Sequence, residues 1–330
     1  MSKIVLVGGT GQVGTILARH YHAAGDDVVV LSRSPKKAPW RTVAWDAKTL
    51  GPWTSELEHA AVVIGLAGRS VNCRYNAANR NAIMASRVDS THAIGQAIAW
   101  SKSPPRTWLQ MSTATIYAHR YDAPNDEATG IIGGNEPGAP PAWNFSIEVA
   151  RAWERAVDEA ATPQTRKVKL RSSVVLSPDR GGIFDTLLTL TRRGLGGTAG
   201  NGKQYVSWIH EADFVRAIEW IAAHDSLTDV VNVASPNPLP NADFMRDLRR
   251  ASRTRIGLPT PKLLIAVGAL FMRTEPELVL KSRRVIPAKL LDSDFEFTYP
   301  TWPQAALDLC ARSRQRRWSD VAATGRRGVA

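Results

Sequence analysis

Residues 3–14 read KIVLVGGTGQVG, a short apolar run followed at once by glycines at every third position. This order of strand, glycine loop and helix is typical of dinucleotide binding, here in the variant form G-x-x-G-x-x-G. Gly8 allows a tight turn, Gly11 lets the backbone approach a pyrophosphate, and Gly14 lets the helix pack closely on the strand. The predicted phosphate-binding residues are Gly8, Thr10, Gly11, Gln12, Val13 and Gly14. We expect the free N–H groups of the helix to bind the phosphates. The alternative is a glycine-rich turn without a ligand.

Strand-like and helix-like patterns alternate along the first 235 residues. Apolar runs rich in β-branched residues predict strands at 27–31, 41–45, 61–66, 107–111, 167–171 and 230–233. Helices are expected between them, the longest at 77–99, 145–160 and 211–222. This alternation predicts an α/β fold with a doubly wound parallel sheet of the Rossmann type. A smaller, mainly helical portion is expected to follow.

The composition divides the chain into three parts. We expect a nucleotide-binding domain over residues 1–235, in which residues 178–228 contribute part of a substrate cleft. A small C-terminal domain is expected over residues 236–311. The arginine-rich tail, residues 312–330, is expected to be disordered.

The net charge of +12 raises the question of nucleic-acid binding. The arginines gather at residues 246–255 and in the tail, and no recognisable nucleic-acid-binding module accompanies them. A solvated helix face and a frayed tail explain these charges better. We therefore expect no nucleic-acid partner, although a basic surface would attract an anionic small molecule.

Other features of the composition point to a cytoplasmic protein. Cys73 and Cys310 are far apart and suggest no disulfide framework, which fits a reducing compartment. The apolar run at 263–272 is shorter than the roughly 20 residues of a membrane span, so we expect a core helix and no membrane partner. The seven histidines show no clustered ligand spacing, and no metal site is expected.

The end of the second predicted strand indicates which dinucleotide binds. An acidic residue there would bind the ribose 2′-hydroxyl of NAD, but this chain has Ser32 and Arg33. Arg33 would form charge-assisted hydrogen bonds with a 2′-phosphate, so we predict NADP(H) as the cofactor. The alternative is an ordinary surface arginine. Asp46, after the third strand, is a candidate acceptor for the adenine amino group. Next to the nicotinamide ribose we expect Leu66, Ala67 and Gly68.

These features resemble the extended branch of the short-chain dehydrogenase/reductases. Besides the glycine loop, the likeness rests on residues 66–68, on MSTATIY at 111–117 and on WIHEAD at 208–213. The chain is more closely similar to the epimerase family proteins, relatives of nucleotide-sugar epimerases with a small C-terminal domain of uncharacterised role. This closer match is carried by SRVDST at 86–91, GNGKQY at 200–205 and SRRVIP at 282–287.

The resemblance implies a catalytic set of Ser or Thr, Tyr and Lys, from which this chain departs. Thr113 takes the hydroxyl position, but the helix that should carry Tyr-x-x-x-Lys reads NFSIE at 144–148 and has neither residue. The tyrosine would exchange a proton during hydride transfer, and the lysine would lower its pKa. Tyr117 is a candidate substitute phenol, or packing beside the cofactor. Glu148 is a candidate base whose pKa is raised in a partly dry cleft, or a plain helix residue.

Substrate contacts are expected where the C-terminal portion meets the cofactor. Gln204 and Trp208 are candidate walls of a substrate pocket, and Arg69 and Arg87 are candidates for binding an anionic group, unless they make structural pairs. The sequence as a whole predicts an NADP(H)-dependent oxidoreductase, or an enzyme like the nucleotide-sugar epimerases, for a small polar substrate. The alternative is a non-catalytic NADP(H)-binding regulator or redox sensor.

Overall fold

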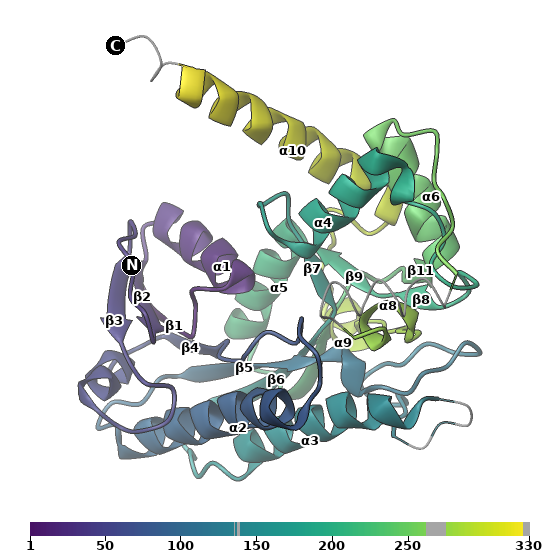
Figure 1. Ribbon diagram of the computed structural model, residues 1–330. Helices are drawn as coiled ribbons and strands as arrows, with labels where there is room; N and C mark the ends of the chain where they lie inside the picture. Colours follow the sequence, from purple (N-terminus) through teal and green to yellow (C-terminus); the bar gives the residue numbers. More distant parts are fainter. Residues whose placement is uncertain (135, 137–138, 262–274, 326–330) are drawn as a thin grey trace.

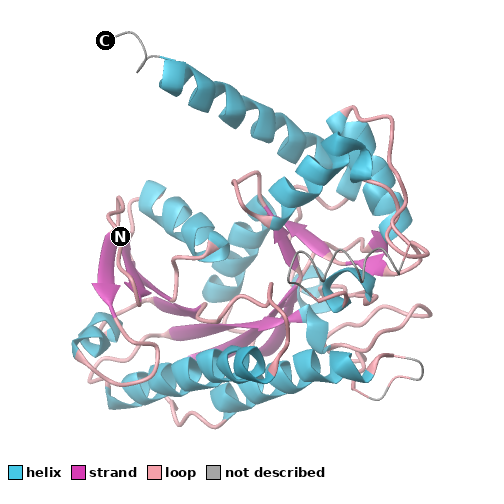
Figure 2. Cartoon of the chain, viewed as in Figure 1, coloured by secondary structure: helices cyan, strands magenta, loops and turns pink. Residues whose placement is uncertain are grey.

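A parallel sheet of seven strands is the centre of the computed structural model, which describes residues 1–134, 136, 139–261 and 275–325. The strand order is β10-β6-β5-β4-β1-β2-β3, and all neighbouring strands are parallel (Figure 1, Figure 2). The strands are β1 (Lys3–Val7), β2 (Asp27–Ser32), β3 (Arg41–Ala44), β4 (Val62–Gly65), β5 (Thr107–Thr113), β6 (Arg166–Ser172) and β10 (Asp229–Val233). The predicted doubly wound sheet of the Rossmann type is confirmed. Its order reverses between β1 and β4, and ligands of such sheets bind at the carboxyl ends of the strands beside this point.

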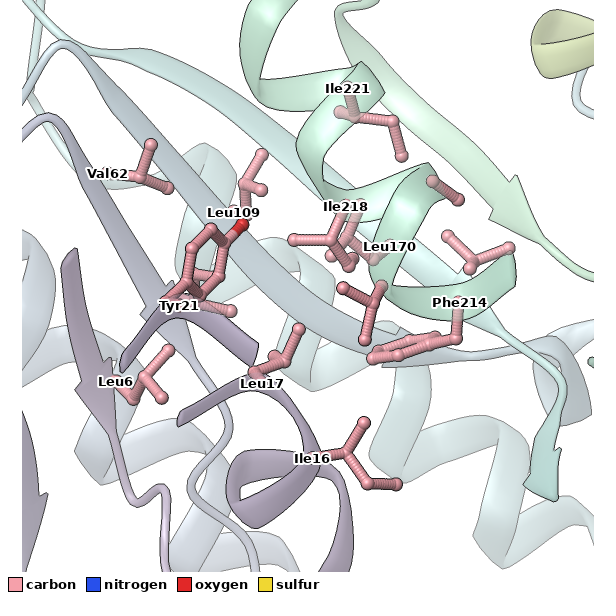
Figure 3. Close-up of a cluster of buried hydrophobic side chains, with 14 of the residues drawn as sticks. Leu6, Ile16, Leu17, Tyr21, Val62, Leu109, Leu170, Phe214, Ile218 and Ile221 are labelled. Atoms are coloured by element: carbon pink, nitrogen blue, oxygen red, sulfur yellow. The ribbon is translucent and has the colours of Figure 1, made fainter. Parts of the chain in front are cut away.

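Helices cover both faces of the sheet (Figure 1). One face carries α1 (Gln12–Ala23) and α5 (Glu211–Ala223), and the other carries α2 (Ala77–Trp100) and α3 (Asn144–Asp158). Figure 3 shows one core, in which Leu17 of α1 and Phe214 of α5 belong to the same buried cluster as Leu6 of β1. Burial on both faces explains why the strands read as continuous apolar runs rather than as alternating patterns.

Apart from α5 and β10, the chain after β6 forms a smaller portion at the carboxyl end of the sheet (Figure 2). Its short strands are β7 (Val174–Leu176), β8 (Tyr205–Val206), β9 (Trp208–His210) and β11 (Leu239–Pro240), of which β7 pairs with β9 and β8 with β11. Its helices are α4 (Ile183–Leu190), η4 (Thr191–Leu195), α6 (Asn241–Ser252), α8 (Glu277–Leu280), α9 (Ala288–Asp292) and α10 (Trp302–Gly325). Three short 3₁₀ helices lie earlier in the chain, at Pro52–Leu57 (η1), Ala114–Ile116 (η2) and Pro141–Trp143 (η3).

The basic tail differs from its prediction. Helix α10 continues through Gly325, so the expectation of disorder is wrong for residues 312–325. Two of its arginines form ion pairs: Arg312 contacts Glu211 and Asp308, and Arg316 contacts Asp179. Extending a helix that has already formed is easier than starting one, because each added residue gains a hydrogen bond. The helix that begins at Trp302 therefore continues past residue 312, where acidic side chains lie beside it. The apolar run at 263–272 lies outside the described residues.

Among the described helices, none is long and apolar enough to cross a bilayer. Across the described part of the chain, no group of three or more His, Cys, Asp and Glu side chains has the geometry to hold a metal ion.

Candidate cofactor and substrate site

The glycine loop joins β1 to α1 at the carboxyl edge of the sheet. Gly8 has φ +79°, and a Cβ at this position would lie 2.6 Å from Cα of Ala67. A Cβ on Gly14 would lie 2.3 Å from the carbonyl oxygen of Gly9. Gly11 is different, because nothing lies within 4 Å of the place where its Cβ would be. Gly8 and Gly14 are thus required by backbone packing, whereas Gly11 leaves the space before α1 open.

The start of α1 fits an anionic pyrophosphate. Its N-cap is Gly11, which has no side chain to bind the free N–H groups, and its first turn carries no acidic residue. Free N–H groups at a helix N-terminus attract phosphate. Gln12 adds a further donor, because its Nε2 is buried and has no hydrogen-bond partner among the described residues. The Gln12 amide lies against Gly182, where a Cβ would come within 2.8 Å of that Nε2.

The end of β2 presents the residues predicted to select the cofactor. Ser32 is buried, and its Oγ accepts a hydrogen bond from the backbone N–H of Ser34 at 3.1 Å. Arg33 is exposed and makes no ion pair with any described residue. Its guanidinium is therefore available for a phosphate.

Asp46 lies in a tight local turn after β3. Its carboxylate accepts hydrogen bonds from the hydroxyl and the backbone N–H of Thr49 and from the backbone N–H of Lys48. These bonds, with the Thr49 hydroxyl first, lower the pKa of Asp46 to about 2. The turn accounts for this carboxylate, and its contact with adenine stays a prediction.

The segment after β4 lies beside the glycine loop and packs against Arg87. Ala67 is buried against Gly8, and a Cβ on Gly68 would lie 3.1 Å from Cζ of Arg87. Arg87 donates hydrogen bonds to the carbonyl oxygens of Arg69 and Ile83, both at 3.1 Å. Burial lowers the pKa of Arg87 to about 10. Within the described residues Arg87 has no carboxylate partner, so it gives this edge of the site an uncompensated positive charge.

Arg69 is brought close to Arg87 but is turned to the surface. It is exposed, and its guanidinium donates to Oδ1 of Asn79 at 2.8 Å. Its backbone N–H donates to Oγ of Ser86 at 2.8 Å. The structure thus places both predicted anion-binding arginines at one end of β4, and their contact with a ligand stays a prediction.

Thr113 is the last residue of β5 and Tyr117 lies four residues later, but the two differ in their surroundings. Thr113 caps η2 and accepts from the backbone N–H of Thr115 at 3.1 Å. Tyr117 is 2% exposed, and its hydroxyl donates to Oδ1 of Asn232 at 2.9 Å and accepts from Nη1 of Arg171 at 3.1 Å. Burial raises the pKa of Tyr117. Both hydrogen-bonding capacities of this phenol are used inside the protein, which favours packing over the role of a substitute acid.

A buried ion pair beside Tyr117 was not foreseen from the sequence. Glu154 of α3 accepts from Nε and Nη2 of Arg171 at 2.8 and 2.7 Å, and from Oγ of Ser112 at 2.6 Å. The pair joins α3 to β5 and β6 beneath the candidate site. The signal that was available is Arg171 itself, because a charged residue inside a buried strand requires a partner.

Helix α3 presents a different face to the sheet than predicted. Glu148 is exposed, so it does not lie in the partly dry cleft that was expected around it. The face toward η2 instead carries Ser146 and Ala150, one helical turn apart. Ala150 is fully buried in a cluster with Ala114 and Tyr117, and Ser146 donates to Oε2 of Glu277 at 2.7 Å. Neither residue is Tyr or Lys, so the departure from Tyr-x-x-x-Lys holds in either register.

Gln204 and Trp208 belong to the interior of the C-terminal portion. Gln204 is 2% exposed and donates from Nε2 to the carbonyl oxygen of Ala199 at 2.9 Å. Trp208 is fully buried, and its ring lies edge-on to Trp302 with centroids 5.2 Å apart. Both residues help to hold the small domain together, and their role as walls of a substrate pocket stays a prediction.

Comparison with protein families identifies the chain. A family model described as the NAD dependent epimerase/dehydratase family matches residues 4–234. The chain belongs to this family. A second model, a domain of unknown function (DUF1731), matches residues 260–309. Similarity to curated family members spans nearly all of the chain: "Epimerase family protein SDR39U1" of Bos taurus is 30% identical over 94% of this chain and 100% of that protein. "Epimerase family protein YfhF" of Bacillus subtilis is 28% identical over 90% of this chain and 94% of that protein.

Solved structures of family members have the same fold. The crystal structure of human epimerase family protein SDR39U1 (isoform 2) with NADPH has a TM-score of 0.81 and 26% identity. The match covers 93% of this chain and 99% of that one. A nucleoside-diphosphate sugar epimerase from Corynebacterium glutamicum has a TM-score of 0.70 and 25% identity, and the match covers 98% of this chain and 68% of that one.

Proposed function

We propose that this member of the epimerase/dehydratase family binds NADP(H) and is an oxidoreductase, or an enzyme like the nucleotide-sugar epimerases, for a small, polar and anionic substrate. The observation that carries the proposal is the open glycine loop, with its unpartnered Gln12 amide, together with the available guanidinium of Arg33. The human relative that was crystallised with NADPH supports the choice of cofactor.

Each part of the cofactor has a candidate partner. The N–H groups of the loop and the Gln12 amide would hold the pyrophosphate. Ser32 and Arg33 would bind the 2′-phosphate, and the backbone of residues 66–68 would lie against the nicotinamide ribose. Bound NADP(H) would supply the hydride chemistry, and the protein would supply binding and orientation.

The substrate side would be formed by the ends of β4 and β5. Thr113 would donate a hydrogen bond to a substrate oxygen, as expected of the hydroxyl residue at this position. Arg69 and Arg87 would attract an anionic group, because the half-buried guanidinium of Arg87 has no carboxylate partner among the described residues. The proposed substrate is therefore a small polar molecule with a negative charge.

The cofactor is tested first by direct binding. NADPH and NADH would be titrated separately, with energy transfer from the 11 tryptophans to the reduced nicotinamide as the signal. We expect NADPH to bind at least about tenfold more tightly, because one charge-assisted contact contributes roughly 1.5–3 kcal/mol. Equal affinities, or tighter binding of NADH, would contradict the assignment.

A non-catalytic NADP(H)-binding regulator or redox sensor is the second candidate. The observation in its favour is that Ser146 and Ala150 occupy the face of α3 toward η2, where neither can handle a proton as Tyr and Lys do. The two candidates are separated by supplying hydroxy acids with NADP⁺ and keto acids with NADPH, both followed by nicotinamide absorbance. Nucleotide sugars would be followed by chromatography of the products, because an epimerase leaves its cofactor unchanged overall. Turnover of any one supports the enzyme, whereas tight NADPH binding without turnover across the panel supports the regulator.

A further inference from the structure

The C-terminal segment places charged side chains at the carboxyl end of β5. Lys281, which follows α8, donates from Nζ to the carbonyl oxygen of Thr115 at 2.9 Å. Arg283 donates from Nε to Oγ1 of the same threonine at 3.1 Å. Glu277 of α8 accepts from Oγ of Ser146 on α3 at 2.7 Å. The C-terminal segment thus packs against η2 and α3. Its contact with η2 is at Thr115, two residues beyond Thr113.

Glu277 and Lys281 are buried but incompletely paired. Their side chains are 3% and 0% exposed, and Nζ lies 3.9 Å from Oε1 of Glu277, which is too long for a hydrogen bond. Oε1 has no hydrogen-bond partner among the described residues. Within the same residues the Lys281 ammonium, which has three N–H groups, donates one hydrogen bond. Buried polar atoms are nearly always satisfied, so a free acceptor beside free donors calls for a further group.

Burial shifts the pKa of both members of the pair. Burial raises the pKa of Glu277, and it lowers the pKa of Lys281 to about 8. Arg283 is the other cation of the cluster, and its guanidinium is already bound by Thr115 and by backbone carbonyl groups. Two further carboxylates act on the pair from nearby: Glu275 on Glu277, and Glu136 on Lys281.

The small residues on α3 explain why the C-terminal segment reaches this position. Ser146 and Ala150 face η2, and both have short side chains, so neither extends far from α3 toward η2. Glu277 extends to Ser146, and Lys281 extends to Thr115. A carboxylate and an ammonium from the small domain therefore lie beside the face of α3 that carries Ser146.

We propose that Glu277 and Lys281 together bind the oxygen of a hydroxyl or carbonyl group on a small polar molecule, such as a hydroxy or keto acid. A hydroxyl group would donate to the free Oε1 of Glu277 and accept from the Lys281 ammonium. A carbonyl group would accept from the same ammonium. Arg87 of α2, whose guanidinium lies against Gly68 after the neighbouring strand β4, favours a ligand that also carries a carboxylate. This inference rests on the proposed function only in treating the ligand as that enzyme's substrate.

The first experiment asks whether a small anionic carbonyl compound reaches Lys281 in the full-length, folded protein. Glyoxylate with cyanoborohydride would be applied at pH 7, and each lysine would be followed by peptide mass spectrometry. A pKa of about 8 leaves roughly 300-fold more neutral amine at pH 7 than the ordinary 10.5. We expect Lys281 to be modified at least about tenfold faster than the exposed Lys203, which serves as the internal reference. Modification of Lys281 only after denaturation would overturn the proposal, because the pair would then be a closed structural contact.

The second experiment asks whether the pair recognises a hydroxyl group. Glycolate should protect Lys281 from glyoxylate, and acetate, which has the same charge but no hydroxyl group, should protect at least about fivefold less, since one hydrogen bond contributes roughly 1 kcal/mol. Glu277→Gln should remove the advantage of glycolate, and the exposed control Glu296→Gln should keep it. Equal protection by both anions, or an unchanged glycolate advantage in Glu277→Gln, would refute the proposed recognition. Circular dichroism would show that both variants are folded.

The cofactor assay separates this inference from the proposed function. NADPH affinity should stay within about twofold in Glu277→Gln, because the pair contacts η2 and α3 rather than the glycine loop. Selective modification of Lys281 in a protein that does not bind NADPH would retain the ligand site and reject the oxidoreductase. NADPH binding without modification of Lys281 would reject the ligand site and leave the proposed cofactor in place.

Discussion

Replacing Arg33 by alanine tests the cofactor assignment at a single side chain. Arg33 is exposed and makes no ion pair with a described residue, so its loss should change the free energy of unfolding by less than about 0.5 kcal/mol. Hydrogen bonds to charged groups contribute roughly 1.5–3 kcal/mol, and the solvated position of Arg33 argues for the lower part of that range. A loss of about 1.5–2 kcal/mol corresponds to a roughly 10- to 30-fold weaker Kd for NADPH. NADH, which lacks the 2′-phosphate, should bind with unchanged affinity.

The assay is a fluorescence titration of both cofactors with wild type, Arg33→Ala and the control Lys36→Ala. Lys36 is also exposed and follows the same strand, but it lies beyond the predicted contact. It should change the NADPH affinity by less than about threefold, since exposed charges are screened over roughly 8 Å at physiological salt. An equal loss for NADPH and NADH in Arg33→Ala would refute the reasoning, as would equal losses in the two variants.

Three further changes probe the site and its support. Gln12→Glu should weaken NADPH and NADH alike, by at least about tenfold, because a carboxylate would face the pyrophosphate; unchanged titrations would argue against the predicted contact. Glu154→Gln should lower the free energy of unfolding by about 3–5 kcal/mol, because it leaves Arg171 without the partner of a buried pair; urea denaturation measures this, and a loss below about 1 kcal/mol would show that the pair contributes little. Lys281 has a folded-state pKa of about 8 against an ordinary 10.5, so between these pH values the unfolded chain holds a proton that the folded protein lacks. Stability of wild type relative to Lys281→Met should therefore rise by about 3 kcal/mol from pH 8 to pH 10.5, and a difference that stays constant with pH would contradict the lowered pKa.

The cofactor side of the site could be predicted because its signals are local. The glycine loop, the end of β2 and residues 66–68 each follow directly after a strand, and parallel strands bring their carboxyl ends to one edge. Recognising the strands therefore placed these segments together. Asp46 shows the limit of this reasoning, because a residue at the correct strand end is bound by its own turn through Thr49.

The substrate side was predicted less well because its geometry depends on packing between distant segments. Glu148 was selected by its spacing from the expected tyrosine position, but the face of α3 that meets η2 carries Ser146 and Ala150. Trp208 was selected as an aromatic near the cleft, yet it is buried against Trp302. No sequence pattern distinguishes an aromatic residue that lines a pocket from one that fills a core.

The sequence by itself determined the parallel sheet, the phosphate loop and the expectation of NADP(H). These follow from the periodicity of buried strands and from glycines whose backbone conformation and lack of a side chain are local properties. Only the tertiary structure decided which side chains meet at the end of β5. Glu277 and Lys281 are more than 130 residues from Ser146 and Thr115 in the chain, and their burial becomes apparent only when the C-terminal segment packs against α3 and η2. This packing excludes water from the pair. It thereby lowers the pKa of Lys281 and leaves Oε1 of Glu277 without a partner among the described residues.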